Sequence, residues 1–497
     1  MILSCWLVSN IGGDSYLFLL KLSMQDTSIC FLNAVEIAKK IRKGEISAVQ
    51  TMEAHLAQIE RINPQVNAIV TLVPELALEE ARKADEKQTK GGNIGPLHGL
   101  PIAHKDLVPT KGIRTTFGSL VFQDFIPEED ALLVERLREG GAIMLGKTNT
   151  PEFGAGSQTF NQVFGVTRNP YDLSKTCGGS SGGAAVSVAC RMLPIADGSD
   201  LGGSLRNPTN YCNVVGFRPS VGRVPSWPNE SGWNSFAVDG PIARTVEDTA
   251  LMLSVLAGPD SRSPICLPER GSIFLKSLER NLKGVRIAWS PDLGGLPVDS
   301  RVTETLEAQR HVFEDLGCVV EEGFPDFSDA DEIFKTFRAW LYELKLASLL
   351  PEHREKIKET VIWNIESGMK LSGPELGRAE VKRTALFHRV REFMQDYDFL
   401  ALPVSQVPPF PVEQEYVSEI NGLQMGTYLD WMRSCYFISV TGQPAISVPC
   451  GFTAKGLPVG LQLVGPPQDD LGVLQLANAF EKATGFYKTM PDLAWST

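Results

Sequence analysis

Residues 175–208 read KTCGGSSGGAAVSVACRMLPIADGSDLGGSLRNP, and they carry two clusters of glycine and serine, at 178–183 and 198–204. Glycine at this density allows positive φ angles and lets backbone N–H groups approach a bound oxygen, while serine hydroxyls are candidate nucleophiles and proton carriers. The small residues at 184–189 predict a helix that would bring the two clusters together. Two loops that meet in this way would form a polar reaction centre. A pair of tight turns, with serine chosen for its size, is the alternative interpretation.

A candidate base lies upstream of these clusters. Lys105 ends a short apolar segment that begins at Leu100 and predicts a strand. A serine hydroxyl needs a base to attack an amide, and no histidine occurs between His104 and His311, so a neutral lysine is the candidate. Burial of Lys105 behind this strand would lower its pKa by desolvation. A surface lysine without a catalytic role, paired with Asp106, is the alternative.

Strands and helices alternate along much of the chain. A helix expected at 130–140 precedes a buried strand at 142–147, and the segments 285–289, 303–316 and 318–321 repeat the order strand, helix, strand. Such alternation is typical of a mostly parallel sheet covered by helices.

Two later strands, expected at 445–448 and 459–464, predict an antiparallel hairpin, so the sheet should be mixed. The predicted fold class is therefore α/β, with a single α/β/α domain and a large mixed, mostly parallel sheet flanked by helices. We assign residues 24–497 to one catalytic domain and residues 1–23 to a dispensable N-terminal extension. The mainly helical region 329–397 is a candidate lid.

Composition narrows the class of protein. The chain of 497 residues is 43% hydrophobic, enough for a sizeable core, and its net charge of -12 argues against a nucleic-acid partner. The nine cysteines are scattered and never form C-x-x-C, which favours neither a disulfide framework nor a zinc site and fits a reducing, cytoplasmic compartment. The apolar stretch at 1–23 is too short and too interrupted to span a bilayer. We therefore expect neither a nucleic-acid nor a membrane partner.

Five motifs resemble those of the amidase signature family. They are GPLHGLPIAHKD at 95–106, GKTNTPEFGAGS at 146–157, CGGSSGG at 177–183, a long motif at 198–225 that begins GSDLGGSLRNP, and GPIARTVEDTALML at 240–253. The resemblance spans the chain from Asn33 to its C-terminus. It implies the α/β/α fold described above and an amidase, a hydrolase of carbon–nitrogen bonds in linear amides.

The resemblance also implies a role for three side chains. Ser204 would be the nucleophile, Ser180 the bridging serine and Lys105 the base of a Ser-cisSer-Lys triad, with a cis peptide bond before Ser180. The expected oxyanion hole consists of the backbone N–H groups just before the nucleophile, those of Leu201, Gly202 and Gly203. An acyl-enzyme on Ser204 would release a carboxylate and ammonia or an amine, with no metal or organic cofactor. We expect a small-molecule amide substrate and a monomer or homodimer.

Three other functions stay open. Within the same family, the chain is a candidate glutaminase (A) subunit of an aminoacyl-tRNA amidotransferase, although the segment 227–236 does not resemble that subunit. Residues 178–182 satisfy the G-x-S-x-G elbow of α/β-hydrolases, which would need His311, His353 or His388. The non-enzymatic alternative is a phosphate or nucleotide binder that uses the two glycine and serine clusters, but these clusters form neither G-x-x-x-x-G-K-[ST] nor G-x-G-x-x-G.

Two pairs of side chains near the clusters have competing interpretations. Asp200 and Arg206 flank Ser204 and are expected to form a structural ion pair rather than a clamp for a substrate carboxylate. Trp227 and Trp233 are candidates either for the wall of an acyl pocket or for ordinary packing.

Overall fold

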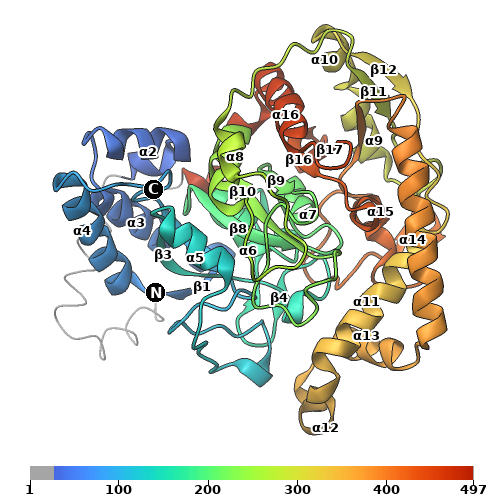
Figure 1. Ribbon diagram of the computed structural model, residues 1–497, viewed down its shortest axis with the longest axis horizontal. Helices are drawn as coiled ribbons and strands as arrows, with labels where there is room; N and C mark the ends of the chain where they lie inside the picture. The colour runs from blue at the N-terminus through green and yellow to red at the C-terminus, as the bar shows by residue number, and fades with distance from the viewer. Residues whose placement is uncertain (1–26, 496–497) are drawn as a thin grey trace.

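The computed structural model describes residues 27–495, so the predicted extension at 1–23 lies outside the described residues. Helices and strands alternate from end to end, with the N-terminal helices on one side of the view and a helical region on the other (Figure 1). None of the helices in 27–495 is both long and apolar enough to span a bilayer. The eight cysteines in this range are all free thiols.

The centre of the fold is a sheet of eight strands in the order β12-β11-β13-β17-β16-β9-β10-β8. Its strands are β8 (Ile195–Asp200), β9 (Val215–Arg218), β10 (Val238–Ala243), β11 (Arg286–Trp289), β12 (Val319–Glu322), β13 (Phe399–Pro403), β16 (Ala445–Phe452) and β17 (Pro458–Val464). Alternate residues of β13 pack into different apolar clusters, Phe399 and Ala401 into one and Leu400 and Leu402 into another. Because successive side chains point to opposite faces of a strand, both faces of the sheet are covered.

A smaller sheet carries the candidate lysine. It has the order β1-β3-β2 and consists of β1 (Ile69–Leu72), β2 (Pro101–Lys105) and β3 (Ile143–Thr148). Strand β2 lies beside β8 at the edge of the large sheet. The C-terminal end of β2 therefore lies next to the second glycine and serine cluster.

Helices cover both faces of the large sheet. The helices outside the helical region of 330–393, of which α3 and α4 pack beside the smaller sheet, are α2 (Ala34–Arg42), α3 (Ala48–Val66), α4 (Pro74–Thr89), α5 (Leu132–Glu139), α6 (Gly182–Ala189), α7 (Arg206–Tyr211), α8 (Val246–Leu256), α9 (Ser300–Glu307), α10 (Arg310–Asp315), α15 (Arg433–Thr441) and α16 (Asp470–Thr484). Every residue of α6 is buried, which explains why only small and β-branched side chains occur there. This helix joins the two serine clusters, as the sequence predicts.

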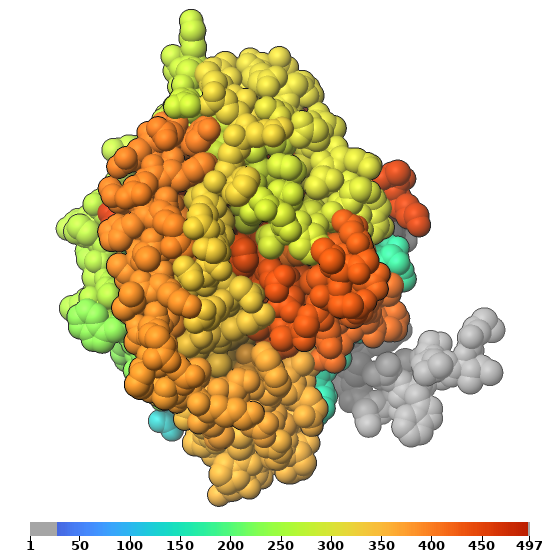
Figure 2. All heavy atoms as spheres, turned by 90° about the vertical axis from the view of Figure 1, so that its right-hand side faces the viewer, coloured from blue at the N-terminus to red at the C-terminus, as the bar shows by residue number. Residues whose placement is uncertain are grey.

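The region predicted to be mainly helical forms a separate wall of the molecule. It consists of α11 (Ala330–Leu346), α12 (Leu350–His353), α13 (Glu359–Met369) and α14 (Gly373–Phe393). These helices, coloured from yellow to orange, occupy the left and lower parts of the face in Figure 2. Helix α11 packs against α13, α14 and α15, so it is held on several sides.

The predicted fold class is confirmed as α/β with a large mixed sheet flanked by helices. The expectation of mostly parallel strands is wrong for the eight-stranded sheet, where five of the seven pairings between described strands are antiparallel. The predicted hairpin is the antiparallel pair β16 and β17. The helix expected at 303–316 is divided into α9 and α10.

Candidate active site

The Lys105 side chain lies at the meeting point of the two serine clusters. Its residue is 0% exposed, and its Nζ donates to Ser180 Oγ at 2.8 Å, Ser181 Oγ at 2.9 Å and Ser199 Oγ at 3.0 Å. It forms no ion pair within residues 27–495. A lysine amine that contacts three hydroxyls and no carboxylate is well placed to exchange protons with serine.

Burial lowers the pKa of Lys105 to about 7, as the sequence predicts, although Asp239, Asp197 and Asp200 oppose the shift. Desolvation penalises the ammonium form of a lysine, so its neutral form becomes populated near neutral pH. Asp197 lies behind this site, where it accepts from the Lys105 backbone N–H at 3.1 Å and contacts His104 Nδ1 at 2.6 Å.

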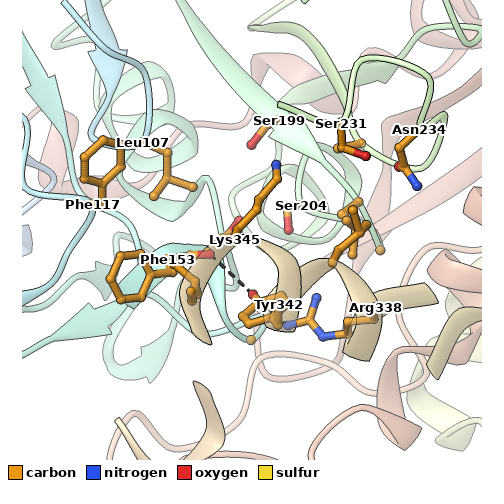
Figure 3. A pocket seen from close by; sticks show the side chains of 18 of the residues that line it. Leu107, Phe117, Phe153, Ser199, Ser204, Ser231, Asn234, Arg338, Tyr342 and Lys345 are labelled. Carbon is orange, nitrogen blue, oxygen red and sulfur yellow. Dashed lines mark hydrogen bonds between the residues drawn. The ribbon is translucent and has the colours of Figure 1, made fainter. Parts of the chain in front are cut away.

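The two candidate serines come from different loops. Ser180 follows a cis peptide bond from Gly179 and lies just before α6, while Ser204 lies between β8 and α7. Both serines line one cavity, but their hydroxyls do not hydrogen-bond to each other in the structure. Figure 3 shows Ser204 and Ser199 at the back of this cavity.

The expected oxyanion donors differ in their availability. The Gly203 N–H donates to Asp200 Oδ1 at 2.8 Å, so the loop itself uses this donor. The backbone N–H groups of Leu201 and Gly202 make no hydrogen bond in the described part of the chain, and both residues line the cavity. The donors at the surface of the cavity are therefore those of Leu201 and Gly202.

Close packing explains the glycines before Ser204. A Cβ atom on Gly202 would lie 2.7 Å from Phe334 Cζ, and one on Gly203 would lie 2.5 Å from Cys435 Cβ. Gly203 also has a φ of +121°, which other residues rarely adopt. The glycines thus let the loop approach α11 and α15.

The Asp200 carboxylate anchors the loop that carries Ser204. It pairs with Arg206 and Arg218, each at 3.0 Å, and all three side chains are 0% exposed. Arg206 continues to Ser439 Oγ at 2.7 Å and to the Cys435 carbonyl at 3.0 Å, which ties the loop to α15. Asp200 and Arg206 therefore form the expected structural ion pair and lie outside the cavity lining.

The cavity beside the serines has a volume of about 400 Å³ and mainly apolar walls. Apolar side chains that line it include Leu107, Phe117, Phe122, Phe153, Phe334 and Leu341. Its polar lining includes Asn229, Ser231, Asn234, Arg338 and Lys345. The candidate lid region thus contributes one wall of the cavity through α11 (Figure 3).

Several predicted contacts are absent from the site. Asp106 bonds to Thr116 Oγ1 at 2.5 Å and does not pair with Lys105. Trp227 and Trp233 do not line the cavity; Arg262 lies 4.7 Å from the Trp227 ring centre, and Trp233 is 79% exposed. No histidine lines the described cavity either, so the G-x-S-x-G alternative finds no base there.

Two side chains in contact with the Lys105 amine, those of Ser181 and Ser199, had no role assigned from the sequence. Both belong to the glycine and serine clusters, and both accept from Lys105. The high density of serine in the two clusters was the sequence signal that could have indicated these contacts. Sequence alone did not show which hydroxyls face the lysine, because this depends on how β8 lies beside β2.

Comparisons with known proteins agree with this geometry. The family model described as Amidase matches residues 50–474. An acylamidase from Rhodococcus erythropolis is 36% identical over 464 residues, covering 92% of this chain and 96% of the relative. A subunit of the glutamyl-tRNA(Gln) amidotransferase from Carboxydothermus hydrogenoformans is 36% identical over 487 residues, covering 93% and 99%.

Comparison with solved structures also finds amide-hydrolysing enzymes. A bacterial aryl acylamidase of the amidase signature enzymes has a TM-score of 0.88 at 29% identity, covering 94% of this chain and 99% of its own. The 6-aminohexanoate cyclic dimer hydrolase has a TM-score of 0.86 at 26% identity, covering 93% and 99%. The fold and the relatives together place this protein in the class of hydrolases that act on carbon–nitrogen bonds. The chain belongs to the amidase signature family, and this membership supports a general amidase activity.

Proposed function

We propose that this chain hydrolyses linear amides of small molecules through an acyl-enzyme on Ser204, with Ser180 and Lys105 as the proton relay. The observation that carries the proposal is the 2.8 Å contact between Lys105 Nζ and Ser180 Oγ at a fully buried amine. Neutral Lys105 can accept a proton from Ser180, and Ser180 can accept one from Ser204, which makes the Ser204 oxygen nucleophilic.

The reaction then follows from the positions of the donors. Ser204 Oγ attacks the amide carbonyl carbon, and the N–H groups of Leu201 and Gly202 stabilise the oxyanion, each such donor contributing roughly 2.7 to 4 kcal/mol. Ser180 returns a proton to the leaving nitrogen, and Lys105 returns one to Ser180. The C–N bond breaks and ammonia or an amine leaves. A water molecule repeats the cycle, which releases the carboxylate and restores Ser204.

A serine-reactive fluorophosphonate followed by mass spectrometry tests this scheme. We expect the adduct on Ser204 and its loss in Lys105→Ala. Lys147→Ala is a matched control, because Lys147 is also 0% exposed but its Nζ bonds to Val108 O and Thr110 Oγ1 instead. Folded Lys147→Ala should still be labelled on Ser204. An adduct on Ser180, or an unchanged adduct in Lys105→Ala, would refute the scheme.

A second candidate is the glutaminase subunit of an aminoacyl-tRNA amidotransferase. It is favoured by the 36% identity to the Carboxydothermus amidotransferase subunit over 93% of this chain. The mainly apolar walls of the cavity favour amides with an aromatic or alkyl part over glutamine. Ammonia release from glutamine, compared with release of amines from aliphatic and aryl amides, separates the two candidates. Release from glutamine alone would favour the glutaminase.

A further inference from the structure

The charged side chains that line the active-site cavity are all positive. Arg338 and Lys345 line it, whereas no Asp or Glu of the described chain does. This is unexpected for a chain with a net charge of -12. Both cations project from α11, which carries Tyr342 between them, and in Figure 3 Lys345 extends past Ser204 while Arg338 lies beside Tyr342. Residues four and seven positions apart lie on one face of a helix, so this face of α11 is a positively charged wall.

Arg338 is a buried guanidinium without a carboxylate partner. It is 6% exposed, and it donates only to hydroxyls, to Tyr428 Oη at 2.9 Å and to Tyr342 Oη at 3.1 Å. Its Nη1 makes no hydrogen bond, and Arg338 forms no ion pair within residues 27–495. Buried charges in proteins are normally paired with an opposite charge. A guanidinium that lines a cavity in this state therefore has an unused capacity to bind an anion.

The orientation of Arg338 is fixed by its neighbours. Tyr428 Oη also accepts from Asn364 Nδ2 at 2.6 Å, and Tyr342 Oη donates to the Phe153 carbonyl at 3.3 Å. The Arg338 guanidinium lies 4.5 Å from the Tyr342 ring centre. These contacts hold the guanidinium in place before any ligand arrives, which lowers the entropic cost of binding.

Lys345 adds a second positive charge to the same face. Its amine makes no hydrogen bond or ion pair in the described chain, and in Figure 3 it extends toward the side of the cavity that carries Ser199 and Ser231. Burial lowers the pKa of Lys345 from its usual value, and Glu230 and Asp239 lie near enough to oppose this shift by favouring the charged form. Neither carboxylate forms an ion pair with it, so the amine stays free to contact a ligand.

We propose that Arg338 and Lys345 bind a carboxylate of the substrate, so that the preferred substrates are amides with a carboxylate besides the scissile bond. The proposal rests on the proposed amidase function at this cavity and names its substrate class. A guanidinium binds a carboxylate through two parallel hydrogen bonds, which makes Arg338 the main partner and Lys345 the second. The apolar walls around Phe117 and Phe153 receive the aromatic or alkyl part of the same molecule.

A binding experiment tests the carboxylate site without any catalysis. The probes are 4-phenylbutyrate and the neutral 4-phenylbutan-1-ol, titrated calorimetrically into Ser204→Ala protein. We expect the carboxylate to bind about tenfold more tightly or better, as hydrogen bonds to a charged group typically allow. Equal binding of the two probes, or tighter binding of the alcohol, would overturn the proposal.

Variants show where the carboxylate binds. Arg338→Gln and Lys345→Met should each reduce the preference for 4-phenylbutyrate, and Arg338→Lys should retain more of it than Arg338→Gln. Lys356→Met is the matched control, because Lys356 is exposed, lies outside the cavity and forms no ion pair in the described chain. A preference that survives in both Arg338→Gln and Lys345→Met would place the anion at the serines and refute the proposal. Lys345→Met decides the question if Arg338→Gln does not fold.

Turnover then identifies which side of the amide carries the carboxylate. Butyranilide is the neutral substrate, glutaranilic acid has a carboxylate on its acyl part, and 4-(butyrylamino)benzoate has one on its amine part. We expect one of the two acids to exceed butyranilide in kcat/KM by about tenfold or more, and this ratio to fall in Lys345→Met. If no anilide is hydrolysed but the binding preference holds, the proposed amidase function fails while the anion site stands. Preferential hydrolysis of butyranilide over both acids contradicts the site.

Discussion

At the scale of single residues, Lys105 is the centre of the proposed chemistry. Its amine is buried, contacts three serine hydroxyls and has no ion pair in residues 27–495. Asp197, which is held between the Lys105 backbone and His104, is close enough to favour the ammonium form without pairing with the amine. The local field therefore leaves both protonation states of Lys105 accessible near neutral pH.

The pH dependence of hydrolysis follows from this lysine. Because the neutral amine is the proposed base, kcat/KM should rise with pH as Lys105 loses its proton, with a midpoint at about 7. Asp239 favours the ammonium form, so Asp239→Asn should move this midpoint to lower pH. Initial rates measured between about pH 5 and 9 give this midpoint for the native protein and for Asp239→Asn. A rate that falls from pH 6 to pH 8 would contradict the assignment of Lys105 as base.

Sequence analysis selected Lys105 and Ser180, which are in contact, and Ser204, which lines the same cavity as Ser180, but it did not predict the use of each backbone donor. Gly203 was expected to face the oxyanion, whereas its N–H donates to Asp200. The glycine pattern signals a tight loop in either case. Whether the Gly203 N–H is available to a ligand or donates to the Asp200 carboxylate depends on where Asp200 points. Arg206 and Arg218, which come from a later helix and strand, determine this direction.

At the scale of elements, local sequence signals explain where several helices start. The start of α3 shows this, because Ser47 Oγ accepts from the Gln50 N–H and Gln50 Oε1 accepts from the Ser47 N–H, both at 2.9 Å. Asp85 of α4 accepts from the Ala48 N–H at 2.7 Å. Helix α16 was not predicted, although it has a capping aspartate, Asp469, whose Oδ1 accepts from the Gly472 N–H at 3.0 Å.

Ser47→Ala should loosen the first turn of α3. The change removes the acceptor of the Gln50 N–H, which typically costs about 1 kcal/mol. Amide hydrogen exchange in this turn should accelerate about fivefold, in line with that free energy. Ser47→Asp, which supplies another acceptor, should exchange at close to the native rate. Unchanged exchange in Ser47→Ala would mean that the Asp85 contacts alone hold the turn.

At the scale of the whole molecule, strand direction was the main error of sequence analysis. Alternating helices and strands favoured a mostly parallel sheet, yet β8, β9 and β10 pair antiparallel in its middle and edge. Their sequences are glycine-rich and were interpreted as motifs rather than strands. Their pairing depends on residues brought together from distant segments, as when Ala445 of β16 pairs with Arg218 of β9.

The buried ion network holds these distant segments together. Burial would raise the pKa of Asp200, but Arg206 and Arg218 hold it below its usual range. Asp200→Asn would leave two buried arginines without a full counter-charge, so we expect a loss of about 3 to 5 kcal/mol in the free energy of unfolding. Denaturant unfolding measures this loss. Glu321→Gln, which breaks an exposed pair with Arg286, should cost about 0 to 1 kcal/mol. Equal losses in the two variants would contradict a structural role of the network.

The serines and Lys105 stand on sheets and loops, whereas the positively charged wall in front of them belongs to α11. The proposed catalytic residues and the proposed carboxylate site thus lie on separate parts of the chain. Residues of α11 can be substituted to accept new substrates while Lys105, Ser180 and Ser204 stay unchanged. Directed evolution toward a different scope should therefore accumulate its changes between positions 334 and 346.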